Sequence, residues 1–154
     1  GSRTSTTPIG SVINGKQQQQ KNLPLIISMH NVEYCATASP FHMSDLVAKV
    51  QKGLEASKKG FAYLHIFSPC PTGWAYPSNK GIEVARNAVK ANVFPLWEMD
   101  QDGYKINFKN KKPISVAEFV KGIGKFKNLT EEDIDSIQKY TNKRYAVLER
   151  LAGE

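Results

Sequence analysis

Cysteine is scarce in this 154-residue chain, which contains only Cys35 and Cys70. Two cysteines are too few for a disulfide framework, and neither lies in a Cys-x-x-Cys pair or in a Cys/His cluster with the spacing of a zinc site. The sequence therefore predicts a protein of a reducing compartment and offers no self-contained metal-binding motif.

Long apolar runs are also missing. No stretch approaches the roughly 18 consecutive apolar residues that a membrane-spanning helix needs, and the first eight residues lack the apolar core of a signal peptide. We therefore expect a soluble, cytoplasmic protein without a membrane partner. A hydrophobic content of 40% in 154 residues suffices for one ordinary domain core.

Positive charge is in excess, with a formal net charge of +7. Such a charge can steer an acidic partner towards the chain, but a solvated, lysine-rich surface is the simpler interpretation. A candidate basic patch consists of Lys105, Lys109, Lys111 and Lys112. No nucleic-acid motif is present, and aromatic residues are not interleaved with the basic ones, so we expect no nucleic-acid partner.

The first half of the chain alternates between helix and strand patterns. Residues 1–22 are a polar, irregular lead-in with a glutamine tract. Residues 23–30 predict a short helix with proline in its first turn, and residues 33–39 predict a strand. Ser44 is a candidate cap for a helix ending near Gly60, whose apolar stripe is Leu46, Val47, Val50 and Leu54. Residues 61–67 are apolar on both faces, which predicts a strand buried between helix layers.

The second half contains a helix, a hairpin and a long helical end. After a loop at 68–80, residues 82–92 predict a helix, and Asp102-Gly103 predicts the turn of a β-hairpin between residues 96–99 and 104–108. Capping boxes are expected at Ser115 with Glu118 and at Thr130 with Asp133. The final helix should pack through a stripe made of Ile134, Ile137, Tyr140, Thr141, Tyr145, Leu148 and Leu151.

Together these patterns predict an α/β fold with a parallel sheet. We divide the chain into the lead-in at 1–22, part of an α/β domain at 23–93, and a β-hairpin with a helical C-terminal extension at 94–154. The loop that begins at Ser68 follows a predicted strand, and ligands in open parallel α/β sheets gather at the carboxyl ends of strands.

Cys70 lies in this loop between two prolines, which fix the backbone, and shortly before Gly73, which permits a sharp turn. The residues alone leave three interpretations open. A buried cysteine acting as a small hydrophobe is favoured. A nucleophile lacks an evident base, because the orientation of His65 is undetermined. An iron–sulfur ligand requires further thiolates, since a 4Fe–4S cluster takes four.

Further evidence comes from five short sequence segments, which follow one another along the chain: Thr4–Pro8, Ala36–Pro40, Ser68–Trp74, Phe94–Glu98 and Phe126–Asp133. Together they resemble the C-terminal half of the β subunits of 2-oxoacid:ferredoxin oxidoreductases, those of pyruvate synthase in particular. The resemblance covers essentially the whole chain, although only Ser-Pro-Cys-Pro-Thr-Gly-Trp is specific by itself. It implies part of a thiamine-diphosphate-binding domain.

The resemblance also implies a role for Cys70, as the last of four ligands to the 4Fe–4S cluster nearest thiamine diphosphate. The implied reaction is the oxidative decarboxylation of a 2-oxoacid, here pyruvate, to acyl-coenzyme A, with electrons passed to ferredoxin. The family's paired-cysteine motif, its third ligand, and its Gly-Asp-Gly stretch for Mg²⁺ and diphosphate are absent from this sequence. The missing N-terminal half and other subunits are therefore expected partners, and the isolated chain is expected to be inactive.

Other residues are assigned mainly to structure. We expect Cys35 in the core, and the scattered His30, His42 and His65 as ordinary structural histidines. Trp74 and Trp97 should be packing anchors. By position after the family's cofactor loop, Thr6 or Thr7 would line the site, and the backbone N–H groups of Thr72 and Gly73 are candidates for hydrogen bonds to cluster sulfur.

An alternative function from another class also follows from the sequence. A stand-alone basic α/β module that binds an acidic protein or nucleic acid, without redox activity, would account for the charge and for the absent catalytic motifs.

Overall fold

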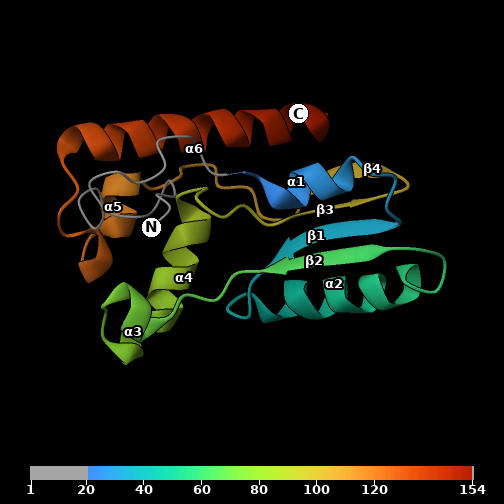
Figure 1. The fold of residues 1–154 in the computed structure, drawn as a ribbon, viewed down its shortest axis with the longest axis horizontal. Coiled ribbons are helices and arrows are strands. Elements are labelled where there is room, and N and C mark those ends of the chain that lie inside the picture. The colour runs from blue at the N-terminus through green and yellow to red at the C-terminus, as the bar shows by residue number, and fades with distance from the viewer. Residues whose placement is uncertain (1–20, 154) are drawn as a thin grey trace.

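The structure is a computed structural model that describes residues 21–153. Its centre is a four-stranded sheet in the order β2-β1-β3-β4 (Figure 1). β1 (Tyr34–Ala38) pairs in parallel with β2 (Ala62–Ile66) and antiparallel with β3 (Trp97–Asp100), which forms a hairpin with β4 (Gly103–Ile106). The α/β class is therefore confirmed, and the sheet is mixed because the hairpin joins it beside β1.

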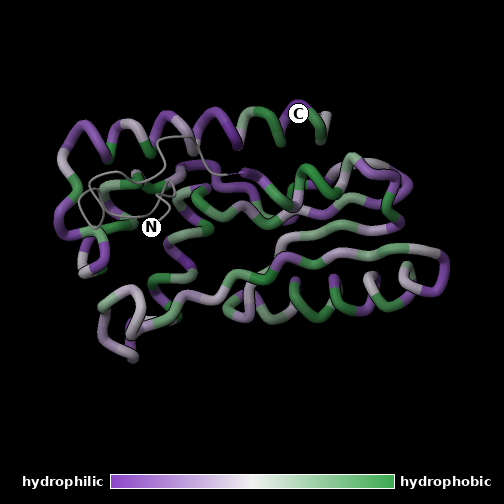
Figure 2. The backbone as a smooth tube through the Cα atoms, viewed as in Figure 1, coloured by the Kyte–Doolittle hydropathy of each residue, from purple (hydrophilic) through white to green (hydrophobic). Residues whose placement is uncertain are grey.

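Helices cover both faces of this sheet. α2 (Met43–Ala56) packs on one face, and α1 (Leu23–Ser28) and α6 (Glu131–Leu151) lie on the other (Figure 1). Apolar and polar segments alternate along α2 and α6 (Figure 2). Within residues 21–153, no helix combines the length and the apolar character that crossing a bilayer requires.

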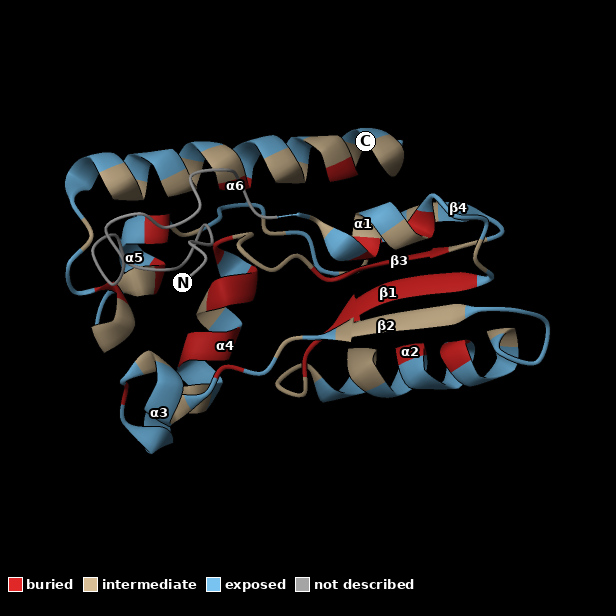
Figure 3. Ribbon diagram, viewed as in Figure 1, coloured by how far each residue is buried: buried red, intermediate tan, exposed pale blue. Residues whose placement is uncertain are grey.

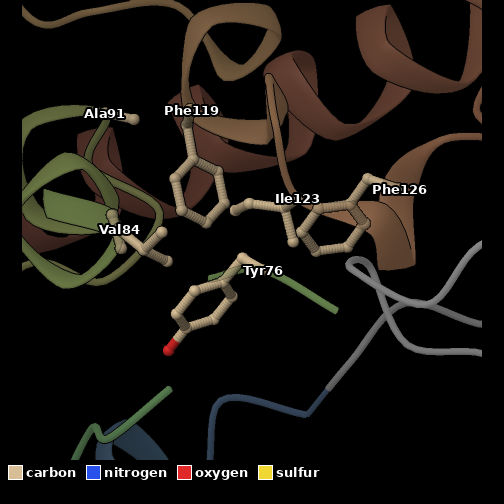
Figure 4. Packing of buried hydrophobic residues seen from close by; sticks show 7 residues of the cluster. Tyr76, Val84, Ala91, Phe119, Ile123 and Phe126 are labelled. Atoms are coloured by element: carbon tan, nitrogen blue, oxygen red, sulfur yellow. The ribbon is translucent and has the colours of Figure 1, made fainter. Parts of the chain in front are cut away.

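A second packed region lies beside one end of the sheet. It is built from three helices and two 3₁₀ turns: α3 (Pro71–Trp74), η1 (Ser78–Lys80), α4 (Gly81–Lys90), α5 (Val116–Val120) and η2 (Gly124–Phe126). Its core consists of buried residues from α4, α5 and η2 and from the segments next to these elements: Tyr76, Val84, Ala88, Ala91, Phe119, Ile123 and Phe126 (Figure 4). Phe67 and Trp74 pack against this cluster, and so connect the end of β2 to it.

Local sequence signals place several element ends correctly. Ser115 Oγ accepts a hydrogen bond from the Glu118 N–H at 3.1 Å, and Thr130 and Asp133 form the full reciprocal capping box at the start of α6. The hairpin is present, but Gln101 and Asp102 form its turn, because Gly103 already pairs with Asp100. Gly103 adopts φ +103°, a left-handed conformation that favours glycine.

The predicted orientation of α2 is wrong. Of the predicted stripe, Val47, Val50 and Leu54 have 37–62% of their surface exposed and Leu46 is half-buried, whereas Lys49 is only 1% exposed. Met43, which was not part of the predicted stripe, is exposed as well. The cause is the close approach of the helix to β2 at Gly53, where an added Cβ would lie 2.7 Å from the Leu64 side chain. The expected cap is also wrong, because Ser44 lies inside the helix and His42 occupies the capping position without a side-chain hydrogen bond.

The prediction of a fully buried strand at 61–67 is wrong as well. β1 is buried along its whole length, whereas β2 is only half-buried (Figure 3). Ile66 at the end of β2 and Phe61 just before the strand are exposed. The reason is topological: in the part of the chain that the structure describes, β2 is an edge strand with β1 as its partner. One face of α2 and the β2 edge of the sheet are therefore not covered by residues 21–153.

Candidate functional site

Cys70 lies at the N-cap of α3, directly after the segment that continues β2, and its side chain is exposed. The interpretation that the residues alone favoured, a buried small hydrophobe, is therefore wrong. Cys70 Sγ accepts a hydrogen bond from the Gly73 N–H at 3.4 Å. This is one of the two predicted donors to sulfur; among the contacts of the described residues, the Thr72 N–H makes none with it.

Tyr76 anchors the Cys70 loop to the second core. Its ring is buried in the aromatic cluster, and its hydroxyl points away from the other labelled side chains (Figure 4). That hydroxyl donates a hydrogen bond to the Pro69 carbonyl at 3.0 Å. Burial, and then the neighbouring Cys70, raise the pKa of Tyr76, so the hydroxyl remains a donor at neutral pH.

The other side of the loop is fixed by η2. The Gly124 N–H donates to the Ala75 carbonyl at 2.9 Å. A Cβ at position 124 would lie 2.8 Å from that carbonyl oxygen, so only glycine allows this approach. Ala75 itself ends α3 in the left-handed conformation at φ 53°. The loop that carries Cys70 is thus held at both of its ends.

Trp74 is a packing anchor, as predicted. Its ring lies 5.8 Å from the rings of Phe67 and Phe126, and 6.5 Å from that of Phe119. Lys125 Nζ lies 5.3 Å from the centre of the same indole, in a cation–π arrangement. Trp97 is also confirmed as an anchor, buried in the hairpin with its ring 5.8 Å from that of Tyr104.

Cys35 is a core residue, as predicted. It is fully buried on β1, and its thiol donates a hydrogen bond to the Pro24 carbonyl at 3.3 Å. Burial raises the pKa of Cys35 to about 12. Because a cluster or metal ligand must be a thiolate, Cys70 is the cysteine suited to coordination.

Two of the three histidines contribute to packing, and His30 is exposed. His42 lies 5.4 Å from the ring of Phe108, and His65 lies 5.8 Å from that of Phe94. Burial lowers the pKa of both groups. Between residues 21 and 153, no three His, Cys, Asp or Glu side chains are grouped so that they could hold a metal ion.

A buried polar network crosses the sheet, which sequence reasoning missed. Glu98 on β3 accepts hydrogen bonds from Tyr34 at 2.8 Å, Lys52 at 2.9 Å and Asn107 at 2.9 Å. Burial alone would raise the pKa of Glu98, but these three bonds outweigh it and leave that pKa below its usual value. The local signal was limited to a carboxylate between the apolar residues Trp97 and Met99.

Lys49 forms a second buried interaction that the sequence did not indicate. Its ammonium group donates to the Thr37 carbonyl and to Asp45, both at 2.8 Å. Burial lowers the pKa of Lys49, although Asp45 opposes this effect. The lysine therefore joins α2 to the carboxyl end of β1.

The remaining predicted site residues lie apart from the Cys70 loop or outside the described residues. Lys105 on β4 is exposed, as are Lys109, Lys111 and Lys112 after this strand. Thr6 and Thr7 lie outside the residues that the structure describes.

Known proteins resemble this chain over nearly its full length. It is 46% identical over 152 residues to the β subunit of an NADH-dependent phenylglyoxylate dehydrogenase from Aromatoleum evansii. It is 37% identical over 145 residues to pyruvate synthase subunit PorB of Methanocaldococcus jannaschii, and 38% identical over 154 residues to ketoisovalerate oxidoreductase subunit VorB of Pyrococcus furiosus. These alignments cover 94–99% of this chain but only 34–49% of the relatives. No family model matches the chain.

Proposed function

Because the chain is homologous, over nearly its full length, to β subunits of the 2-oxoacid:ferredoxin oxidoreductase family, we propose that it is one part of such a subunit. In the complete assembly it would contribute Cys70 as one ligand of a 4Fe–4S cluster. The activity would be the oxidative decarboxylation of a 2-oxoacid. The chain spans a third to a half of the length of these relatives, and in this proposal the rest of the machinery lies outside the present sequence.

The observation that carries this proposal is the environment of Cys70. A cluster ligand needs a thiolate that the cluster can reach, and N–H donors near the sulfur tune the cluster potential. Cys70 is exposed, accepts the Gly73 N–H, and sits on a loop anchored by Tyr76 and Gly124. These features fit a single ligand held in a fixed position.

A 4Fe–4S cluster takes four thiolate ligands, and in this proposal the chain supplies one of them, Cys70. A bound cluster would supply one-electron transfer. This chain would hold one corner of the cluster, keep the Gly73 N–H directed at sulfur, and restrict water through the packed Trp74 side. Thiamine diphosphate and Mg²⁺ would be bound by other polypeptide, because the family's motifs for them are absent from this sequence.

The names of the relatives support a substrate class rather than one substrate. They refer to phenylglyoxylate, pyruvate and ketoisovalerate, which are all 2-oxoacids. Pyruvate itself and coenzyme A stay predictions for this chain. Ferredoxin as the acceptor also stays a prediction, because one relative is named as NADH-dependent.

The uncovered surfaces support docking to the remainder of the subunit. Helix α2 exposes an apolar stripe of Met43, Val47, Val50 and Leu54 while it buries Lys49, an arrangement that suits a helix between two protein layers. The edge of β2 next to it offers backbone groups for a further strand. We infer that both surfaces are covered in the assembly. The alternative of a stand-alone basic module rests on the net charge and on the absent catalytic motifs, and none of these relatives is named as such a module.

The assignment of Cys70 can be tested on the assembly purified through a tag on this chain. We expect Cys70→Ser to lower the iron content and to change the electron paramagnetic resonance spectrum of the reduced protein, because serine is a poor replacement for a thiolate. Cys35→Ser is the matched control and should leave both unchanged. Full iron content with an unaltered spectrum in Cys70→Ser would exclude Cys70 as a ligand.

A further inference from the structure

A cavity of about 390 Å³ lies between the carboxyl ends of β1 and β2, helix α1 and helix α6. Its walls are mainly apolar and aromatic, with Phe67, Trp74, Phe94 and Trp97 among the lining residues. Its polar lining includes Lys21, Asn22, Thr37, His65 and Arg144, and none of the described lining residues is a carboxylate. The volume and the mixture of apolar walls with a few polar groups are typical of small-molecule sites.

Arg144 is the unusual group in this cavity. Its Nε is buried, and no described residue accepts a hydrogen bond from it. The guanidinium lies 5.5 Å from the ring of Tyr140, but a cation–π contact uses the face of the cation and leaves its N–H donors unused. Burying an arginine without an acceptor is costly, so such groups are normally paired.

The other polar groups of the cavity do not supply that acceptor. Thr37 Oγ1 already donates to the Pro95 carbonyl at 2.7 Å and accepts from the Trp97 N–H at 3.0 Å. His65 Nδ1 lies 3.3 Å from the Tyr63 hydroxyl. Burial, and then the charge of Arg144, lower the pKa of His65, which keeps this ring neutral. The cavity thus combines aromatic walls with an arginine whose Nε has no acceptor among residues 21–153.

We propose that this cavity binds the carboxylate of a small organic acid that carries an aromatic or branched apolar group, with Arg144 as the anion-binding residue. The planar guanidinium can donate two parallel hydrogen bonds to a carboxylate. The apolar part of the ligand would lie against the rings of Phe94 and Trp97. This binding is independent of the proposed function, because it requires neither a cluster nor turnover.

Phenylacetate is a suitable probe, and phenylacetamide is its uncharged counterpart. Binding is measured by calorimetry on the protein purified through a tag on this chain, in whichever assembly it occurs. We expect phenylacetate to bind at least tenfold more tightly than phenylacetamide. Arg144→Gln should weaken phenylacetate binding by at least tenfold and leave phenylacetamide unchanged, and Arg144→Lys should weaken it less, since lysine keeps the charge but loses the paired donors.

The matched control is Arg150→Gln. It removes the same charge from an exposed position of the same helix, outside the cavity, and should change phenylacetate binding by less than twofold. Equal affinity for the acid and the amide would overturn the proposal. So would equal losses in Arg144→Gln and Arg150→Gln, or no binding of phenylacetate by the wild-type protein up to roughly 10 mM; the last result would mean that a polypeptide carboxylate neutralises Arg144.

Discussion

The hydroxyl oxygen of Tyr76 lies 3.0 Å from the carbonyl oxygen of Pro69, the residue that precedes Cys70. A buried ring from the second core therefore fixes the backbone of an exposed cysteine. The two parts of Tyr76 have different roles. Its ring packs in the second core and stabilises the fold, whereas its hydroxyl holds the Cys70 loop in position. Tyr76→Phe removes the attachment alone.

We expect Tyr76→Phe to lower the free energy of unfolding by about 1 kcal/mol, the usual contribution of one hydrogen bond, and to raise the alkylation rate of Cys70 by loosening its loop. Urea unfolding and iodoacetamide labelling measure the two effects. Tyr104→Phe is the control, since its hydroxyl bonds Ser28 on the opposite side of the molecule. That variant should lose similar stability with no change in Cys70 labelling. Equal labelling in all three proteins would contradict the anchoring role.

The two cysteines should differ sharply in reactivity. A disulfide reagent such as dithionitrobenzoate should modify Cys70 quickly and Cys35 only after unfolding, because Cys35 is fully buried with its pKa raised to about 12. Absorbance at neutral pH should show one fast thiol in the native chain and none in Cys70→Ser. In an assembly that contains the cluster, Cys70 should become unreactive. A fast thiol in native Cys70→Ser would show that Cys35 is accessible.

Glu98 should make the fold sensitive to acid. Its pKa in the folded chain lies below the ordinary value, so its contribution to stability is complete above the pKa of an unfolded glutamate and is lost as the pH falls through the folded pKa. Glu98→Gln should lower the free energy of unfolding at neutral pH by about 1–3 kcal/mol, because the buried Tyr34 and the ammonium group of Lys52 lose their charged acceptor. Below the ordinary glutamate pKa its stability should approach that of wild type.

The measurement is urea unfolding across a pH series from neutral to acid. Glu118→Gln is the matched control, since Glu118 is exposed on α5. It should follow the wild-type curve. A constant difference between Glu98→Gln and wild type at every pH would show that the ionised carboxylate does not supply the stabilisation.

The apolar stripe of α2 should matter for assembly more than for folding. Val47→Gln with Leu54→Gln should change the free energy of unfolding by less than about 0.5 kcal/mol per site, because both side chains are largely exposed. The same double variant should reduce the amount of partner polypeptide that co-purifies with the tagged chain. Ala48→Gln, an exposed position of α2 outside the stripe, should reduce neither. A large loss of stability in the double variant would place the stripe inside the fold of this chain.

Local signals predicted most elements but not how they face one another. The Thr130 and Asp133 box, the proline in α1 and the hairpin depend on neighbours in sequence, and they are confirmed. The orientation of α2 depends on Gly53 meeting Leu64, and an apolar stripe does not reveal whether it faces this chain or another. A helix that buries its lysine cannot be predicted from periodicity alone.

Some residues of the candidate site could likewise be predicted from the sequence, and others could not. The Ser68–Trp74 string indicated Cys70, and the hydrogen bond from Gly73 follows the predicted turn. Tyr76 was not indicated, because its contact with Pro69 depends on how the second core folds back on the loop. Arg144 and Glu98 were also missed, since their surroundings come from strands and helices that are distant in sequence.

The open edge of β2 has a consequence for how this polypeptide is made. An edge strand beside an apolar helix face can pair with any exposed strand, including that of another copy. If the chain is synthesised without the remainder of its subunit, the β2 edge stays exposed. The chain then stays monomeric only until this edge pairs with a strand of its partner or of another copy. Production together with that partner should therefore raise the yield of dispersed protein, and production alone should favour aggregates.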